Sequence, residues 1–181
     1  MDLKTVLKNA KFALSKDFSR SALCGVYFDK KEHHYNIVAT DGHLLYKYCM
    51  AHDDVRHGFL LMGLLDLMPD ENFIFYGDEK FRSKTELKIF DTDNIYPKYE
   101  TVIPSPENGT PINSAQFYVA FDPERHVQVK KILKSHSMPS PMLGIRNLTT
   151  KVGPAWTDID CGFEDRSLVL LMPLRMSEDG N

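Results

Sequence analysis

Cysteine is scarce in this chain of 181 residues, and the three cysteines, Cys24, Cys49 and Cys161, form no CxxC pair. An odd number of isolated thiols is typical of a reduced compartment and does not fit a disulfide scaffold or a structural zinc site. We therefore expect all three to be small core residues and the protein to be cytoplasmic.

Long apolar runs are also missing. No stretch approaches the roughly 18 apolar residues of a membrane-spanning helix, and residues 1–16 carry four lysines, which a signal-peptide core would not contain. The formal net charge of −3 excludes a chain that coats nucleic acid with its whole surface. Any contact with DNA has to come from a local basic face, and no membrane partner is expected.

Catalytic signatures are absent as well. The sequence contains no GxSxG elbow, phosphate-binding P-loop or paired-carboxylate motif. An acid–base set of Asp41, His43 and a distant Ser21 is the enzymatic alternative, but turn geometry already explains the first two. His33 and His34 are adjacent, so in a strand they would point to opposite faces and could not share a metal. We expect no enzymatic activity, no cofactor and no bound metal.

The patterns that are present alternate between helix and strand. Apolar residues at the 3.6-residue period predict an amphipathic helix over residues 3–16, and the apolar run at 62–68 predicts a short second helix. Runs rich in β-branched and aromatic residues predict strands at 25–28, 35–40, 43–50, 72–76 and 85–90. Helices mixed with antiparallel strands and short turns indicate an α+β fold, with helices covering one face of the sheets.

Two of these strands are separated by Asp41-Gly42 alone. An Asp-Gly pair is favoured in two-residue hairpin turns because both positions need positive φ. The sequence thus predicts a tight hairpin with Thr40 and His43 side by side at its tip.

Four prolines and an Asn-Gly pair between residues 97 and 111 indicate a linker, which we place at 105–114. The segment Asp122-Pro123-Glu124 beyond it has the order of an N-cap, a first-turn proline and a first-turn acid, and predicts a helix to about Lys134. Strands are predicted around that helix at 117–121, 142–146, 157–163 and 168–172. We therefore expect one domain at 1–104 and a smaller unit at 115–181.

Three separate segments carry a resemblance to a known family: IVATDGHLL at 37–45, YPKYETVIP at 96–104 and LLMPLRM at 170–176. In this combination and order they resemble the bacterial sliding clamp, the β subunit of DNA polymerase III. The resemblance implies a DNA-clamp fold built of repeated helix-plus-sheet half-units. Residues 1–104 look like a complete middle domain of that family, and 115–181 like the second half of its last domain.

In that family the three segments meet in a groove that receives short peptides of polymerases and other replication proteins. Transferred by position, the resemblance implies a groove made of Leu23, Thr40, Gly42, His43, Leu44, Leu45, Pro97, Thr101, Val102, Leu170, Met172, Pro173, Leu174 and Arg175. Leucine, valine, proline and adaptable methionine suit a short apolar peptide, with His43 and Arg175 at the rim to orient it. For Leu23, Leu45 and Val102 the alternative is that they simply fill the core.

Two positions depart from the family pattern, which usually has arginine where this chain has Leu44 and Thr101. A less basic groove implies a more apolar or differently tuned partner peptide. Residues 177–181 also extend beyond the usual family terminus, where they would be placed to shade the groove.

The same resemblance implies that lysine-bearing helices face DNA. The expected DNA-binding residues are Lys4, Lys8, Lys11, Lys130, Lys131 and Lys134. Lysines that touch only phosphates give sequence-independent and mobile contact with the double helix. The expected function is a non-catalytic processivity factor for a DNA polymerase, with a clamp loader as a further partner. The alternative is a regulator or decoy that binds the same peptides without encircling DNA.

The resemblance also bears on assembly. A ring of this family contains twelve half-units, and the helix-then-strands order occurs about three times in this chain, so closure by equivalent units would take four copies. We therefore expect a homo-oligomer, with a tetramer as its closed form, against the alternative of a monomer or dimer.

Overall fold

The computed structural model describes residues 1–77, 89–103, 122–136, 155–159 and 167–172. The helices are α1 (Leu3–Ala10), α2 (His52–Leu61) and α3 (Pro123–Ser135), with 3-10 turns η1 (Lys11–Ala13), η2 (Phe18–Cys24), η3 (Leu65–Leu67) and η5 (Tyr99–Val102). The strands are β1 (Val26–Lys30), β2 (His34–Thr40), β3 (Leu44–Ala51), β4 (Phe73–Phe75), β5 (Phe90–Asp91), β6 (Ala155–Ile159) and β7 (Ser167–Leu171).

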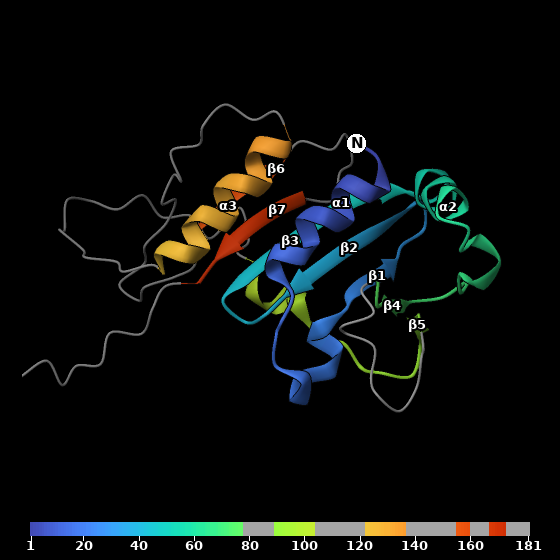
Figure 1. Cartoon of the computed structure of the whole chain (residues 1–181), viewed down its shortest axis with the longest axis horizontal. Coiled ribbons are helices and arrows are strands. Elements are labelled where there is room, and N and C mark those ends of the chain that lie inside the picture. The colour runs from blue at the N-terminus through green and yellow to red at the C-terminus, as the bar shows by residue number, and fades with distance from the viewer. Residues whose placement is uncertain (78–88, 104–121, 137–154, 160–166, 173–181) are drawn as a thin grey trace, which may run out of the picture.

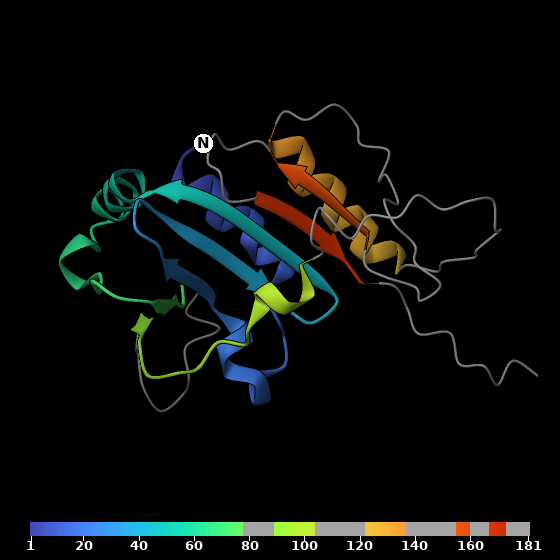
Figure 2. The ribbon, with the colours of Figure 1, turned by 180° about the vertical axis from the view of Figure 1, so that it is seen from behind.

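The described strands form one antiparallel sheet of seven strands, in the order β5-β4-β1-β2-β3-β7-β6. Figure 1 shows α1 and α3 lying side by side across one face of this sheet, with α2 at its end. The same sheet seen from behind, in Figure 2, carries η5 on its other face. The predicted α+β fold, with helices on a sheet face, is confirmed.

Each sheet face has its own core because side chains alternate along a strand. The helix face buries strand residues such as Phe28, Ile37 and Tyr46 against apolar residues of α1, α2 and α3. The opposite face buries Val38, Leu45 and other residues against η2 and the segment before and within η5. Strands buried on both faces are apolar at nearly every position, as β3 is.

The strand β7 pairs with β3, with Leu44 opposite Leu171. The sheet is therefore continuous between the two predicted units, and their boundary remains a prediction. The predicted linker at 105–114, the strands at 117–121 and 142–146, and Cys161 all lie outside the described residues. Cys24 and Cys49 are buried and free, as expected. Within the described part of the chain, no helix is both long and apolar enough to cross a bilayer.

The predicted helix over 3–16 is too long. Asp2 caps α1 by accepting the amide of Thr5 at 2.8 Å, but the helix ends at Ala10, η1 follows, and Leu14 takes an extended backbone. The physical cause is the next contact along the chain, since the amide of Ser15 donates to the carbonyl of Leu23 at 2.9 Å. A strand-like bond at this point is incompatible with a further helical turn.

The predicted helix at 62–68 is wrong. The helix lies before it, as α2, and Gly63 ends it at a φ of 68°. The amide of Leu64 donates to Phe59 and that of Gly63 to Leu60, both at 2.9 Å, which is the Schellman pattern of a helix end. Of the predicted segment, only Leu65–Leu67 forms a 3-10 turn.

Helix α2 approaches α1 through Gly58, where an added Cβ would collide with the Cβ of Leu3. We expect Gly58→Val to destabilise the protein by about 1–3 kcal/mol, because neither backbone can yield without repacking the helix face. His57→Val on the exposed side of α2 is the control, since it changes helix propensity alone. Urea denaturation of both variants measures the difference, and equal losses would contradict the close approach.

Candidate functional site

The turn between β2 and β3 builds one wall of the site, and it is shifted from the predicted one. Thr40 pairs with Leu45, and the amide of Asp41 donates to Leu44 at 3.4 Å, so the central residues are Gly42 and His43. Gly42 has the expected positive φ, 92°. The predicted Asp41-Gly42 centre is wrong, and Thr40 stands opposite Leu45 and not beside His43.

Side chains explain the shift. One carboxylate oxygen of Asp41 accepts the amides of His43 and Leu44, each at 2.9 Å. The hydroxyl of Thr40 accepts from the amide of Gly42 at 3.1 Å and donates to the carbonyl of Leu44 at 2.9 Å. Asp41 therefore closes the turn from its first corner, a role that Asp side chains often take.

The third segment reaches the same place through β7. The amide of Met172, just after that strand, donates to the carbonyl of His43 at 2.8 Å. Leu170 stands opposite Leu45 in the β3–β7 ladder. The end of β7 is thus fixed beside the turn by backbone bonds.

The segment at 96–103 is anchored to the other sheet face by two tyrosines. The ring of Tyr96 stacks on Tyr27 with centroids 4.6 Å apart. The hydroxyl of Tyr99 donates to the carboxylate of Asp29 at 2.5 Å and accepts from the amide group of Asn36 at 3.3 Å. Burial and the bond to Asp29 raise the pKa of Tyr99, so it stays a neutral donor. These contacts hold η5, and with it Val102, against the sheet.

The three segments, together with Arg20 and Leu23 of η2, enclose an apolar pocket of about 160 Å³. Its lining is Arg20, Leu23, Thr40, Gly42, Leu44, Leu45, Pro97, Lys98, Tyr99, Val102, Leu170 and Met172. The structure therefore brings together nine of the expected groove residues, from four regions of the chain. Their binding role remains a prediction.

The lining residues differ in exposure. Leu23 and Leu45 belong to the buried core of that face, so they form the pocket floor as well as filling the core. Val102 is 42% exposed and Met172 is partly buried, and both are accessible at the mouth. The core-filling alternative thus holds for the floor but not for Val102.

Five expected groove residues are not in this lining. Thr101 is exposed on η5, and its hydroxyl donates to the carbonyl of Lys98 at 2.8 Å. His43 is exposed on the other side of the turn, where it borders a polar hollow of about 490 Å³. Pro173, Leu174 and Arg175 lie outside the described residues.

Sequence reasoning missed three residues of the lining. Lys98 and Tyr99 lie within the second motif itself, so the motif already contained them. Arg20 lies three residues before Leu23, in the irregular η2 turn, where no periodic pattern singles it out. Arg20 and Lys98 place two cations beside an otherwise apolar lining.

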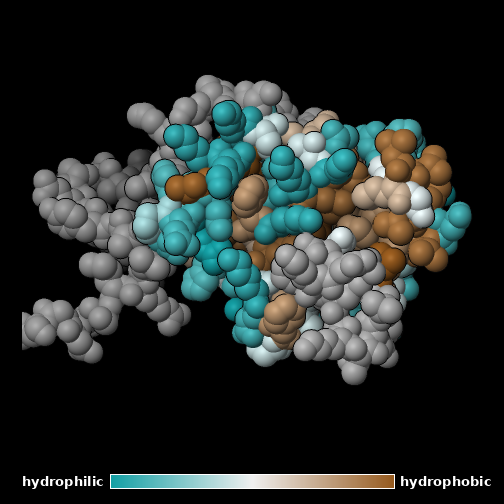
Figure 3. Space-filling model, viewed as in Figure 1, coloured by the Kyte–Doolittle hydropathy of each residue, from teal (hydrophilic) through white to brown (hydrophobic). Residues whose placement is uncertain are grey.

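The six candidate lysines are all exposed on α1, η1 and α3. The two helices contact each other, and Asn9 of α1 donates to the hydroxyl of Ser135 at 2.6 Å. Lys131 of α3 has its ammonium 5.6 Å from the ring centre of Phe12. Figure 3 shows hydrophilic residues over these helices and an apolar area toward α2. We name the exposed side of α1, η1 and α3 the lysine surface.

Beneath the lysine surface, His136 is wedged between the helices and the sheet. Its Nε2 lies 3.3 Å from the side-chain nitrogen of Asn9 and 3.2 Å from the hydroxyl of Tyr46. Burial, with a smaller contribution from the N-terminal ammonium, lowers the pKa of His136 to about 4. A neutral ring can accept a hydrogen bond at Nε2, whereas a protonated ring cannot.

This histidine predicts a pH-dependent stability. The pKa is near 6.5 in the unfolded chain, so unfolding takes up a proton below that pH and stability falls as the pH drops from 6.5 toward 4. We expect a loss of about 1 kcal/mol between pH 7 and 5, allowing for partial exposure. His136→Gln should lack this part of the pH dependence in urea denaturation. An identical pH profile would contradict the assignment.

Two alternatives considered from the sequence are a metal site and an acid–base set of Asp41, His43 and Ser21. No group of three His, Cys, Asp or Glu side chains in them is arranged to hold a metal ion. Asp41 is occupied by turn amides, and the hydroxyl of Ser21 accepts from Asn94 at 2.9 Å. This arrangement does not form the considered acid–base set.

No protein-family model matches the sequence, and no curated protein matches it. Among solved structures, the chain is similar to a DnaN sliding clamp from Bartonella birtlesii bound to griselimycin, with 18% identity, 96% of this chain, 64% of that one and a TM-score of 0.46. It is also similar to the DNA polymerase III β subunit of Thermotoga maritima, with 15% sequence identity and a TM-score of 0.47. That match covers 98% of this chain and 65% of the other. A β sliding clamp of C. crescentus with bound PEG shares 14% sequence identity with this chain, with a TM-score of 0.31. That match covers 96% of this chain and 49% of the other.

The chain thus spans less than two thirds of the length of the clamps it matches. The similarity covers nearly all of this chain. The chain is similar in structure to DNA polymerase III β sliding clamps over most of its own length.

Proposed function

We propose that this protein is a sliding-clamp-like accessory factor of DNA replication, which binds short peptides of polymerases or other replication proteins in the apolar pocket. The observation that carries the proposal is the convergence of the three motif segments on that pocket. These segments are far apart in sequence, yet together they form a pocket with a buried apolar floor and with Pro97 and Val102 exposed in its lining.

The pocket also suggests the chemistry of its ligand. Leucine, valine, proline and methionine side chains favour one or two apolar anchors of a peptide. Arg20 and Lys98 in the same lining favour an acidic residue next to those anchors. With Leu44 and Thr101 in place of the family's arginines, we expect the apolar anchors to dominate the affinity.

The proposal includes DNA as a second partner, bound through the lysine surface. Six exposed lysines on α1, η1 and the adjacent α3 suit contact with phosphates. Such contacts carry no base information, so the protein would slide. A clamp loader belongs to the same proposal.

Two assays run side by side test it. The first is fluorescence anisotropy with a probe peptide, a fluorescein-labelled nonapeptide with two leucines, one phenylalanine and one aspartate, against a control peptide whose three apolar residues are serines. Griselimycin, which the Bartonella birtlesii clamp binds, serves as a competitor. The second is retention on nicked circular DNA, with and without linearisation. If the protein binds neither the probe peptide nor griselimycin, the proposed peptide-binding function is overturned.

The second candidate is the regulator or decoy that binds client peptides without encircling DNA. The observation in its favour is that the pocket lies on the sheet face opposite the helices that carry the lysine surface, so a peptide could bind there without any contact with DNA. Peptide binding together with no retention on circular DNA would select this candidate.

Assembly separates the two candidates further. The proposed ring of four copies requires self-association. Leu60 and Leu61 of α2 and Leu67 of η3 are apolar side chains more than half exposed, which suits such a contact. Light scattering on a sizing column at micromolar concentration measures the assembly directly. A strictly monomeric particle would remove the ring and leave the decoy.

A further inference from the structure

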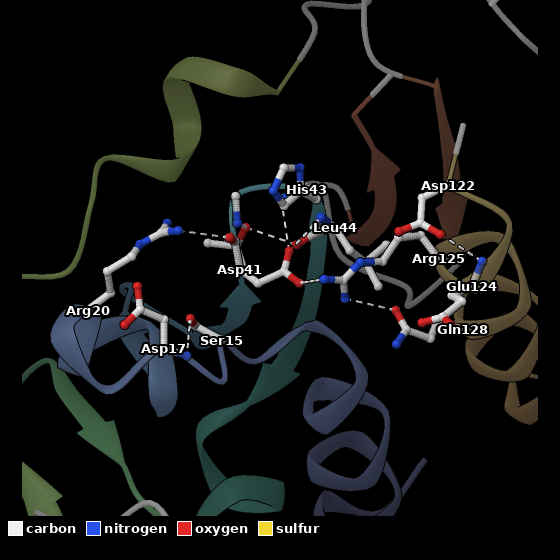
Figure 4. A network of polar contacts seen from close by, with 12 residues as sticks. Ser15, Asp17, Arg20, Asp41, His43, Leu44, Asp122, Glu124, Arg125 and Gln128 are labelled. Carbon is white, nitrogen blue, oxygen red and sulfur yellow. Dashed lines mark hydrogen bonds and ion pairs between the residues drawn. The ribbon is translucent and has the colours of Figure 1, made fainter. Parts of the chain in front are cut away.

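The carboxylate of Asp41 is held from two sides. One oxygen accepts the turn amides of His43 and Leu44, and the other faces the guanidinium of Arg125 at 2.5 Å. Figure 4 shows Arg125 reaching this carboxylate from α3, with Gln128 beside it. Gln128 accepts from Arg125 at 3.1 Å and so holds the guanidinium from its own helix.

This ion pair is well shielded from water. The side chain of Asp41 is 6% exposed and that of Arg125 is 24% exposed. The second carboxylate oxygen of Asp41 is buried and has no described hydrogen-bond donor besides this guanidinium. A buried carboxylate without its cation is strongly disfavoured, so the turn would have to open and let water reach it.

The held turn is a wall of the pocket. Thr40, Gly42 and Leu44 line the pocket, whereas Arg125 does not. On the far side, Arg20 donates to the carbonyl of Asp41 at 3.3 Å, and its guanidinium lies against Gly42. The turn is therefore held between Arg20, which lines the pocket, and Arg125 of α3. Arg125 lies some eighty residues after the turn in the sequence.

We propose that Arg125 is a positioning residue for the peptide pocket: by pairing with Asp41 it holds the Gly42 turn in the shape that receives the ligand. The inference rests on the proposed peptide binding. It makes the pocket dependent on the docking of α3. The predicted unit at 115–181 would then shape a site to whose lining its described residues contribute Leu170 and Met172.

A double-mutant cycle on the full chain tests the pairing. With the probe peptide, Arg125→Gln should weaken binding about tenfold, while in an Asp41→Asn background the same change should cost less than about twofold. Arg125→Lys should restore most of the affinity, because an ammonium still pairs with the carboxylate. His126→Ala, exposed on the same helix, should leave affinity unchanged. Equal losses from Arg125→Gln in both backgrounds would overturn the proposal.

Amide hydrogen exchange in the free protein gives a readout without peptide. In Arg125→Gln the amides of His43 and Leu44 should exchange at least about tenfold faster, while that of Ile37 in β2 keeps its rate. Unchanged exchange at the turn would overturn the proposal, as would faster exchange with unchanged affinity. If the wild type binds no probe peptide, the proposed function fails, and the exchange rates alone decide whether Arg125 holds the turn. If Arg125→Gln does not fold, Asp41→Asn against wild type supplies both measurements, because it removes the other charge of the same pair and should likewise weaken peptide binding and speed exchange at the turn.

Discussion

Val102→Asp is expected to lower affinity for the probe peptide about 100-fold. Val102 lies at the pocket mouth, 42% exposed, on the segment held by Tyr96 and Tyr99. An aspartate there would either be desolvated by an apolar anchor or keep water in the pocket, and either outcome removes the main source of binding energy. Fluorescence anisotropy with the probe peptide measures the effect.

The matched control is Ile95→Asp. Ile95 is 89% exposed, lies just before this segment, seven residues ahead of Val102, and is outside the pocket lining. It introduces the same charge without touching the site, so affinity should stay within about twofold of wild type. Thermal unfolding of both variants checks that the fold is kept. Equal affinities for the two variants would contradict the position of the site.

The hairpin shows how far local sequence determines this fold. The two strands and the positive φ of Gly42 follow from β-branched residues and a flexible glycine. The centre of the turn is shifted by one residue because the carboxylate of Asp41 captures two amides and is itself neutralised by Arg125. That cation arrives from α3, and no local rule for Asp-Gly turns contains it.

Helix α2 shows the same limit on a larger scale. Its sequence has only Val55 and Phe59 as buried apolar residues, with a glycine in between. The apolar run after it looked more helical, but Gly63 takes a left-handed conformation and ends the helix. Helix α2 is stabilised by tertiary packing, because Phe59 packs on the aromatic core and Gly58 packs on Leu3. Propensity is too weak to oppose such contacts.

The site was predictable to the extent that the motifs contain it. Periodicity alone would assign Leu23, Leu45 and Leu170 to a core, and they are indeed buried. Their convergence with Val102 and Met172 followed from the resemblance, not from any pattern within one segment. Arg20 could not be predicted as a lining residue, because a single arginine in an irregular turn has no recognisable pattern. The fold alone brings it next to Gly42.

The second prediction with a large expected effect concerns DNA binding by the lysine surface. Reversing Lys4, Lys8 and Lys11 together to glutamate should reduce affinity for double-stranded DNA at low salt by at least about 100-fold. Each lysine that neutralises a phosphate contributes about 0.9 to the slope of log affinity against log salt, so the slope should flatten by about 3. Filter binding or anisotropy with a labelled duplex, over a series of salt concentrations, measures both quantities.

Single substitutions provide the matched comparison. Lys8→Glu and Arg56→Glu make the same charge change at exposed helix positions, but Arg56 is on α2, outside the lysine surface. Only Lys8→Glu should weaken DNA binding, because a contact with phosphates is local within about a Debye length. Equal effects would indicate a response to net charge, and unchanged loading of the triple variant on circular DNA would exclude α1 as a DNA-facing helix.

The triple variant also separates the two candidate functions, because its substitutions lie on the helix face while the pocket opens on the other face of the sheet. Its affinity for the probe peptide should therefore equal that of wild type. A protein that acts as a clamp would lose DNA retention in this variant and keep its peptide. In a decoy, the same substitutions would change neither property, since the wild type would have no DNA retention to lose.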